Sequence, residues 1–233
     1  MAGVAMVTGA GRGLGAAIAD KLLFDGWSLS IGLRDKSQAK RFDVGSDRLH
    51  VGHFDALDSG SAKQWVNDTF DHFGKINALV NNAGVLRMVD FEKGSEDDLD
   101  YLWSVNVKAP FRLIQVALPY LKATGAGRVI NIASTDAKRF RPGTSLGYSM
   151  TKHSLLAMTQ AVRHAGWDDG IRATAICPGA IDTDLIAHLP GVTSKADRLR
   201  PETVAEIVAF ILTLPNQASV PEFIANTRLE TFI

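Results

Sequence analysis

Hydrophobic residues along the chain occur in two alternating patterns. Short continuous apolar runs, typical of strands buried on both faces, alternate with longer stretches of helical period. Strands are predicted at Gly3–Thr8, Ser28–Leu33, Leu49–Phe54, Ala78–Val80, Arg128–Ala133, Arg172–Ile176 and Phe223–Ala225. Helices are predicted at Leu14–Phe24, Ala62–Phe73, Asp97–Leu121 with a break near Pro110, Tyr148–Ala165 and Pro201–Leu214. This order predicts an α/β fold, a doubly wound parallel sheet of about seven strands with helices on both faces.

Two polar segments fit neither pattern. Ser37–Asp47, between the second and third predicted strands, is too short for a helix, and His188–Arg200 has the composition of a mobile loop. The chain carries no repeat, linker or low-complexity tract. We therefore expect one domain over residues 1–233.

The composition narrows the classes of function. The 233 residues include 25 basic and 25 acidic side chains, a balance without the clustered positive charge that binds nucleic acid or anionic membranes. No apolar run approaches the roughly 20 residues that span a bilayer, and the first residues lack the pattern of a secretory signal. The single cysteine, Cys177, suits a reducing compartment. We expect a soluble, cytoplasmic protein.

A glycine-rich motif lies where the first predicted strand passes into the first helix. It runs Thr8-Gly9-Ala10-Gly11-Arg12-Gly13-Leu14-Gly15. Glycine permits a tight turn and the close approach of a pyrophosphate, and the N-terminus of a helix offers unpaired N–H groups to an anion. A surface turn is the alternative, but the flanking strand and helix favour a dinucleotide site.

Two further motifs stand after a strand and at the start of a helix. Asn81-Asn82-Ala83-Gly84 follows the fourth strand, where ligand contacts collect in parallel sheets, although these residues also make ordinary turns. Tyr148 and Lys152 are four residues apart and share a helix face. Because an ammonium favours the phenolate, this pairing predicts a Tyr148 pKa lowered from about 10 toward neutrality.

Two isolated polar residues complete the candidate chemistry. Ser134 ends the fifth predicted strand, at the edge where ligands bind. Asn106 interrupts an apolar helical stretch, and the alternative for it is a core amide bonded to neighbouring backbone.

In order and spacing these segments resemble the short-chain dehydrogenase/reductase family. The resemblance rests on the motifs above and on Pro178-Gly179-Ala180-Ile181-Asp182-Thr183, and it covers residues 3 to about 214. It implies an oxidoreductase that transfers hydride between nicotinamide and a small carbonyl or alcohol substrate, with Tyr148 as general acid and base. Ser134 would steady the carbonyl, Lys152 would lower the Tyr148 pKa and bind the nicotinamide ribose, and Asn106 would anchor a water that resupplies the proton.

The resemblance also implies the cofactor contacts. Asp55 and Ala56 would bind the adenine, although Asp55 is otherwise a simple turn residue. The backbone of Ile181 and the hydroxyl of Thr183 would hold the carboxamide. The full set is Gly9, Gly11, Arg12, Gly13, Leu14, Gly15, Arg34, Asp55, Ala56, Asn82, Ala83, Gly84, Tyr148, Lys152, Pro178, Gly179, Ile181 and Thr183.

The end of the second strand bears on the choice between NADP(H) and NAD(H). Leu33 occupies the place where NAD enzymes of this kind carry an acidic residue. Arg34 follows it and Arg12 lies in the glycine motif, so two guanidinium groups are available for a 2′-phosphate. NADP(H) is therefore preferred, while NAD(H) remains open if Asp35 is the ribose ligand instead.

Two segments should border the substrate. The run Lys138-Arg139-Phe140-Arg141 suits an anionic substrate, or else is a solvated loop or subunit contact. Asp184–Arg200 has the position of a lid.

Three departures or alternatives stay open. Thr135 competes with Ser134 because the interval to Tyr148 is one residue longer than usual in the family. The tail Asn226–Ile233 lacks the family's Asp-Gly-Gly segment, so a homodimer and a homotetramer are both expected candidates. A catalytically silent dinucleotide sensor or scaffold, or another enzyme of this fold such as a methyltransferase, is the competing function.

Overall fold

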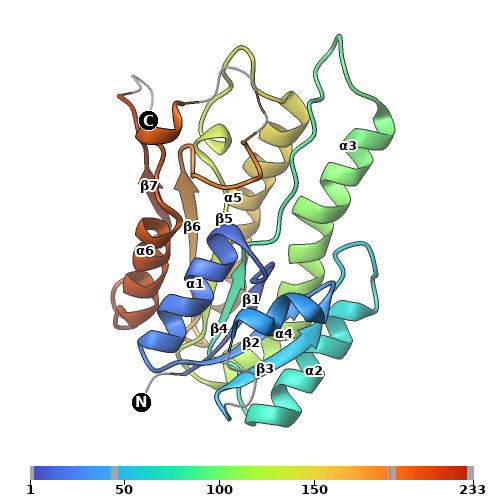
Figure 1. The fold of residues 1–233 in the computed structure, drawn as a ribbon. Coiled ribbons are helices and arrows are strands. Elements are labelled where there is room, and N and C mark those ends of the chain that lie inside the picture. The colour runs from blue at the N-terminus through green and yellow to red at the C-terminus, as the bar shows by residue number, and fades with distance from the viewer. Residues whose placement is uncertain (1–2, 43–46, 188, 190–192, 230–233) are drawn as a thin grey trace.

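A parallel seven-stranded sheet forms the centre of the protein (Figure 1). The computed structural model describes residues 3–42, 47–187, 189 and 193–229. Neighbouring strands all pair in parallel, in the order β3-β2-β1-β4-β5-β6-β7. The strands are β1 Val4–Thr8, β2 Ser28–Leu33, β3 Leu49–His53, β4 Ala78–Asn81, β5 Arg128–Ile132, β6 Arg172–Pro178 and β7 Glu222–Ala225. The predicted fold class is confirmed, and each strand lies within two residues of its predicted ends.

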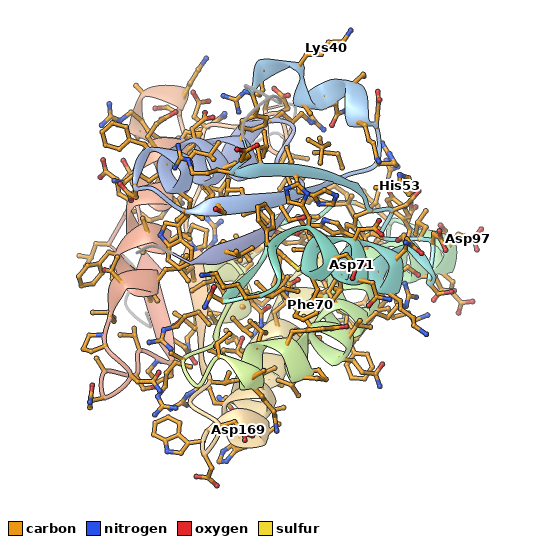
Figure 2. The ribbon with its side chains drawn as sticks, turned by 90° about the horizontal axis from the view of Figure 1, so that it is seen from below. Lys40, His53, Phe70, Asp71, Asp97 and Asp169 are labelled. Atoms are coloured by element: carbon orange, nitrogen blue, oxygen red, sulfur yellow. The ribbon has the colours of Figure 1, made fainter. Side chains whose placement is uncertain are left out.

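Helices cover both faces of this sheet (Figures 1 and 2). Helices α1 and α6 pack together on one face, while α2, α4 and α5 cover the other. Their bounds are α1 Gly13–Phe24, α2 Ser61–Phe73, α3 Glu96–Trp103, α4 Ala109–Ala123, α5 Leu146–Gly166 and α6 Pro201–Thr213. All residues of β1, β4 and β5 are buried, which explains why these strands are mostly apolar and do not alternate between apolar and polar residues.

The long helical stretch predicted over Asp97–Leu121 is divided differently from the expectation. A π-helical segment, η2 Ser104–Lys108, separates α3 from α4, so the interruption comes before Pro110 rather than at it. Pro110 has no N–H for the carbonyl four residues earlier, and the N–H of Ala109 instead binds the carbonyl of Ser104, five residues earlier. The π-helical turn is one residue longer than an α-helical turn, and it contains Asn106, a predicted site residue.

The two polar segments acquire short 3₁₀ turns. The side chain of Asp35 accepts a hydrogen bond from the N–H of Ser37 and so caps η1, Lys36–Arg41. In the second segment, His188 and residues 190–192 lie outside the described residues. Its described part contains η4, Lys195–Asp197, and Leu199 pairs with Ile181. Mobility of this segment stays a prediction.

Candidate active site

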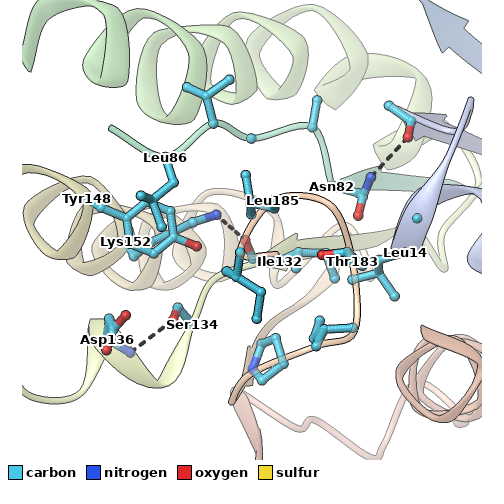
Figure 3. Close-up of a pocket in the computed structure, with 18 of the residues that line it drawn as sticks. Leu14, Asn82, Leu86, Ile132, Ser134, Asp136, Tyr148, Lys152, Thr183 and Leu185 are labelled. Atoms are coloured by element: carbon cyan, nitrogen blue, oxygen red, sulfur yellow. Dashed lines mark hydrogen bonds between the residues drawn. The ribbon is translucent and has the colours of Figure 1, made fainter. Parts of the chain in front are cut away.

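The predicted site residues come together at the carboxyl ends of the strands. A cavity of about 560 Å³ opens there, between the glycine loop, the ends of β4, β5 and β6, and the start of α5 (Figure 3). Of the four predicted catalytic residues and the full set of predicted cofactor contacts, all but Asn106 line this cavity. Parallel sheets place their ligands at this edge.

The glycine loop has the backbone shape that a phosphate cradle needs. Gly9 and Gly13 have φ angles of 66° and 55°, which favour glycine. A Cβ at Gly15 would lie 2.2 Å from the carbonyl oxygen of Gly9, so no other residue fits there without a shift of the backbone. Helix α1 has no acidic residue in its first turn and no side-chain cap at Arg12, which leaves its N–H groups open to an anion. The loop therefore fits a dinucleotide pyrophosphate.

The segment after β4 holds the glycine loop in place. The hydroxyl of Thr8 accepts hydrogen bonds from the backbone N–H groups of Asn82 and Ala83, both at 2.9 Å. The Asn82 amide donates back to the carbonyl of Thr8 at 2.9 Å (Figure 3). The Asn82 side chain thus supports the glycine loop, which an ordinary turn residue would not do.

Arginine and acidic side chains near the end of β2 divide into two groups. Arg34 is exposed and lines the cavity, whereas Asp35 does not line it. Asp35 accepts two hydrogen bonds from Ser37, and these bonds lower the Asp35 pKa. Arg12 forms an ion pair of 2.8 Å with Asp184, which lies in the loop after β6 on the other side of the cavity.

The side of the cavity near the glycine loop and the end of β2 includes a residue that the sequence did not indicate. Gln38, on η1, reaches so close to Gly11 that a Cβ there would lie 2.3 Å from the Gln38 Oε1 atom. Its position depends on the 3₁₀ turn, for which the sequence carried no signal. Asp55 accepts a hydrogen bond from the N–H of Leu57 at 2.9 Å, as expected of a turn residue, and it also lines the cavity.

Ser134, Tyr148 and Lys152 lie at the other end of the pocket (Figure 3). The Ser134 hydroxyl accepts a hydrogen bond of 3.0 Å from the N–H of Asp136 and caps the short turn η3, Thr135–Ala137. Tyr148 is buried in the first turn of α5, where Ser145 caps the helix. The Lys152 Nζ atom lies 5.5 Å from the centroid of the Tyr148 ring.

Lys152 and Asn106 are buried beside each other. The Lys152 ammonium donates to the carbonyl of Ile132 at 2.8 Å, and burial lowers its pKa to about 8. The Asn106 amide bonds to both backbone groups of Val85, at 2.9 Å, and donates to the Thr151 hydroxyl at 3.1 Å. A Cβ built on Gly84 would lie 3.4 Å from Asn106 Oδ1 and 3.5 Å from Lys152 Nζ. Asn106 is thus a satisfied core amide that also adjoins Lys152.

The predicted direction of the Tyr148 pKa shift is wrong for this structure. Burial raises the pKa of Tyr148 above its usual value, the negative charge of Asp136 adds to this, and a hydrogen bond with Ser134 opposes it. Sequence spacing indicated the ammonium of Lys152 but not the burial of the phenol or the carboxylate of Asp136. The phenol is therefore held in its protonated form.

The basic run after Ser134 splits between two environments. Lys138 does not line the cavity and pairs with Glu222 of β7 at 2.6 Å. Arg139 and Arg141 line the cavity, and both approach Asp136, at 2.6 Å and 4.0 Å. Of the predicted basic run, the part that lines the cavity is therefore a pair of arginines near the Asp136 carboxylate.

Comparisons with known proteins identify the family of this chain. The short chain dehydrogenase family matches residues 3–190, and the chain belongs to this family. An agropine synthesis reductase of Rhizobium rhizogenes is 39% identical over 224 residues, which make up 94% of this chain. The chain spans only 51% of that relative. It is thus similar to about half of a longer protein.

Two solved structures share the whole fold. An alcohol dehydrogenase from Thermococcus sibiricus, complexed with 5-hydroxy-NADP, has a TM-score of 0.89 and 29% identity, with 99% of this chain and 100% of that one covered. A 3-ketoacyl-(acyl-carrier-protein) reductase from Brucella melitensis, complexed with NADH, has a TM-score of 0.88 and 26% identity, with 96% of both chains covered. Both of these structures hold a nicotinamide dinucleotide, and this chain shares their fold along nearly its whole length. Within the described residues, every helix is too short or too polar to cross a membrane.

Proposed function

We propose that the protein is an NADP(H)-dependent oxidoreductase that transfers hydride between nicotinamide and a small carbonyl or alcohol substrate. The observation that carries the proposal is that Ser134, Tyr148 and Lys152 line the same cavity as the glycine loop. The bound cofactor would supply or accept the hydride. The glycine motif, Asp55, Ala56, Asn82–Gly84 and the Pro178–Thr183 segment would hold it.

Tyr148 has the role of proton donor to the carbonyl oxygen, and Ser134 donates a hydrogen bond to the same oxygen. Tyr148 carries its proton at neutral pH, as the general acid of a carbonyl reduction must. Lys152 would bind the nicotinamide ribose through its ammonium. Asn106, adjoining Lys152, would anchor the water that resupplies the proton.

NADP(H) is the proposed cofactor, with NAD(H) as the weaker one. Arg34 lines the cavity and Asp35 is engaged by Ser37 outside it, which supports capture of a 2′-phosphate over recognition of the ribose by a carboxylate. Arg12 lines the cavity as well, already paired with Asp184. Titration of the protein with NADPH and NADH by intrinsic fluorescence tests this choice. In Arg34→Ser the affinity for NADPH should fall about tenfold or more while that for NADH changes little.

Replacement of Tyr148 by Phe tests the chemistry. Activity toward a panel of aldehydes and ketones should fall about 10²-fold or more, while NADPH still binds. Tyr120→Phe is the matched control, because Tyr120 bonds to Asn67 on α2 and does not line the cavity. Retained activity in Tyr148→Phe would indicate different chemistry. Cofactor binding without turnover by the parent protein would instead favour the silent sensor or scaffold.

We also propose that one domain over residues 1–233 carries the cofactor and substrate sites and works in the cytoplasm. A homodimer or homotetramer, assembled through the helices that hold Asn106 and Tyr148, is the expected form. Light scattering after size-exclusion chromatography measures the subunit number.

A further inference from the structure

The arginines beside the reacting end of the cavity form a small, asymmetric cluster. Arg139 pairs with Asp136 at 2.6 Å and with the hydroxyl of Thr135 at 3.4 Å. These contacts fix Arg139 on the wall of the cavity, where the exposed fraction of its side chain is 12%. The exposed fraction of the Asp136 side chain is similar, at 16%. The Asp136 carboxylate and the Arg139 guanidinium are therefore paired with each other.

Arg141 is held differently and retains binding capacity. Its nearest carboxylate oxygen is on Asp136, 4.0 Å away, which is too far for a hydrogen bond. Its Nε atom is buried and has no hydrogen-bond partner among the described residues, while the side chain as a whole is 36% exposed and can present its terminal nitrogen atoms to a ligand. The carbonyl of Arg141 accepts hydrogen bonds from the N–H and the hydroxyl of Thr144, so the backbone beneath this side chain is fixed by a turn.

The cluster is adjacent to the proposed reaction centre. The N–H of Asp136 donates to the Ser134 hydroxyl at 3.0 Å (Figure 3). Arg139 and Arg141 follow in the same short stretch of chain, and both line the cavity. A planar carboxylate matches the fork of a guanidinium, with which it can form two parallel hydrogen bonds.

We propose that Arg141, supported by Arg139 and Asp136, binds a carboxylate group of the substrate, so that the enzyme acts on carbonyl compounds that carry a carboxylate. The neighbouring side chains Leu86, Met88 and Leu185 also line the cavity and provide apolar surface for the carbon skeleton between the two groups. This substrate class rests on the proposed function, because it assumes that the carbonyl is reduced at Tyr148.

The test compares 4-formylbenzoate with its methyl ester as substrates with NADPH. The acid should be reduced with a kcat/KM about tenfold or more above that of the ester, mainly through KM. In Arg141→Met this preference should disappear while reduction of the ester persists, which shows that the variant is folded. Lys138→Met, which removes a charge of the same basic run outside the cavity, should keep the preference.

Several results would overturn the carboxylate site. These are equal use of acid and ester by the parent protein, loss of the preference in Lys138→Met as well, or a preference for dihydroxyacetone phosphate over dihydroxyacetone without one for the acid over the ester. If neither aldehyde is reduced, the proposed function fails. Calorimetric titration with 4-(hydroxymethyl)benzoate and its methyl ester then decides alone. Tighter binding of the acid that is lost in Arg141→Met supports the site, and equal binding overturns it.

Discussion

The burial of Lys152 should make the stability of the protein depend on pH in a way that a single substitution can isolate. Burial lowers the Lys152 pKa from 10.5 to about 8. Between these two values the unfolded chain binds the proton and the folded protein does not. Because the unfolded state then holds more protons, the free energy of unfolding rises with pH across this window. Below about pH 8 the cost of the buried ammonium is fully present.

The magnitude follows from the two pKa values. Each pKa unit corresponds to about 1.4 kcal/mol, so the contribution of Lys152 should increase stability by about 2 kcal/mol between pH 7.5 and pH 10. Other groups titrate in the same range, so the useful quantity is the difference between the parent protein and Lys152→Met. This difference should change by about 2 kcal/mol in favour of the parent as pH rises.

Urea denaturation of the cofactor-free protein at several pH values measures this difference. Lys63→Met removes an exposed lysine and controls for the change in net charge. A difference between parent and Lys152→Met that stays constant from pH 7.5 to pH 10 would refute the reasoning. It would mean that Lys152 carries its proton in the folded state as readily as in the unfolded chain.

Three further predictions concern the site. Gly15→Ala should weaken NADPH binding about tenfold or more and lower the melting temperature, because its Cβ would lie 2.2 Å from the carbonyl oxygen of Gly9; fluorescence titration and calorimetry measure both. Cys177 is buried and its pKa is raised to about 11, so labelling by a thiol reagent at pH 8 should be about a hundredfold slower in the native protein than in urea. Asp136→Asn removes a charge that raises the Tyr148 pKa, so the pH profile of alcohol oxidation should shift to lower pH, and an unchanged profile would contradict this.

The sheet could be predicted from the sequence because its strands are buried on both faces. Apolar runs such as Val4–Val7 in β1 mark the position of a strand, and polar or glycine residues follow the run. The interruption between α3 and α4 was predicted near the right place from Pro110, but its form was not. A π-helical segment depends on which backbone groups find partners after packing, and hydrophobic periodicity does not report that.

Positions along the chain indicated which residues gather at the cavity, because parallel strands bring their carboxyl ends to one edge. They did not indicate the contacts that depend on side-chain reach. Gln38 approaches Gly11 from a turn that no pattern predicted, and Arg12 finds Asp184 across the cavity. Both partners come from loops, where the sequence gives composition but not direction.

The pKa of Tyr148 shows why a spacing rule is insufficient for electrostatics. Four residues along a helix place Lys152 near the phenol, and an ammonium nearby favours the phenolate, but removal of the phenol from water opposes its ionisation. Here the ammonium donates to the carbonyl of Ile132, and both Tyr148 and Lys152 are buried. The negative charge of Asp136 raises the pKa of Tyr148 further. Asp136 also holds Arg139, so the residue that keeps the phenol protonated is the one that organises the proposed carboxylate site. An anionic substrate bound at Arg141 would add negative charge on the same side, which further favours the protonated phenol that carbonyl reduction requires.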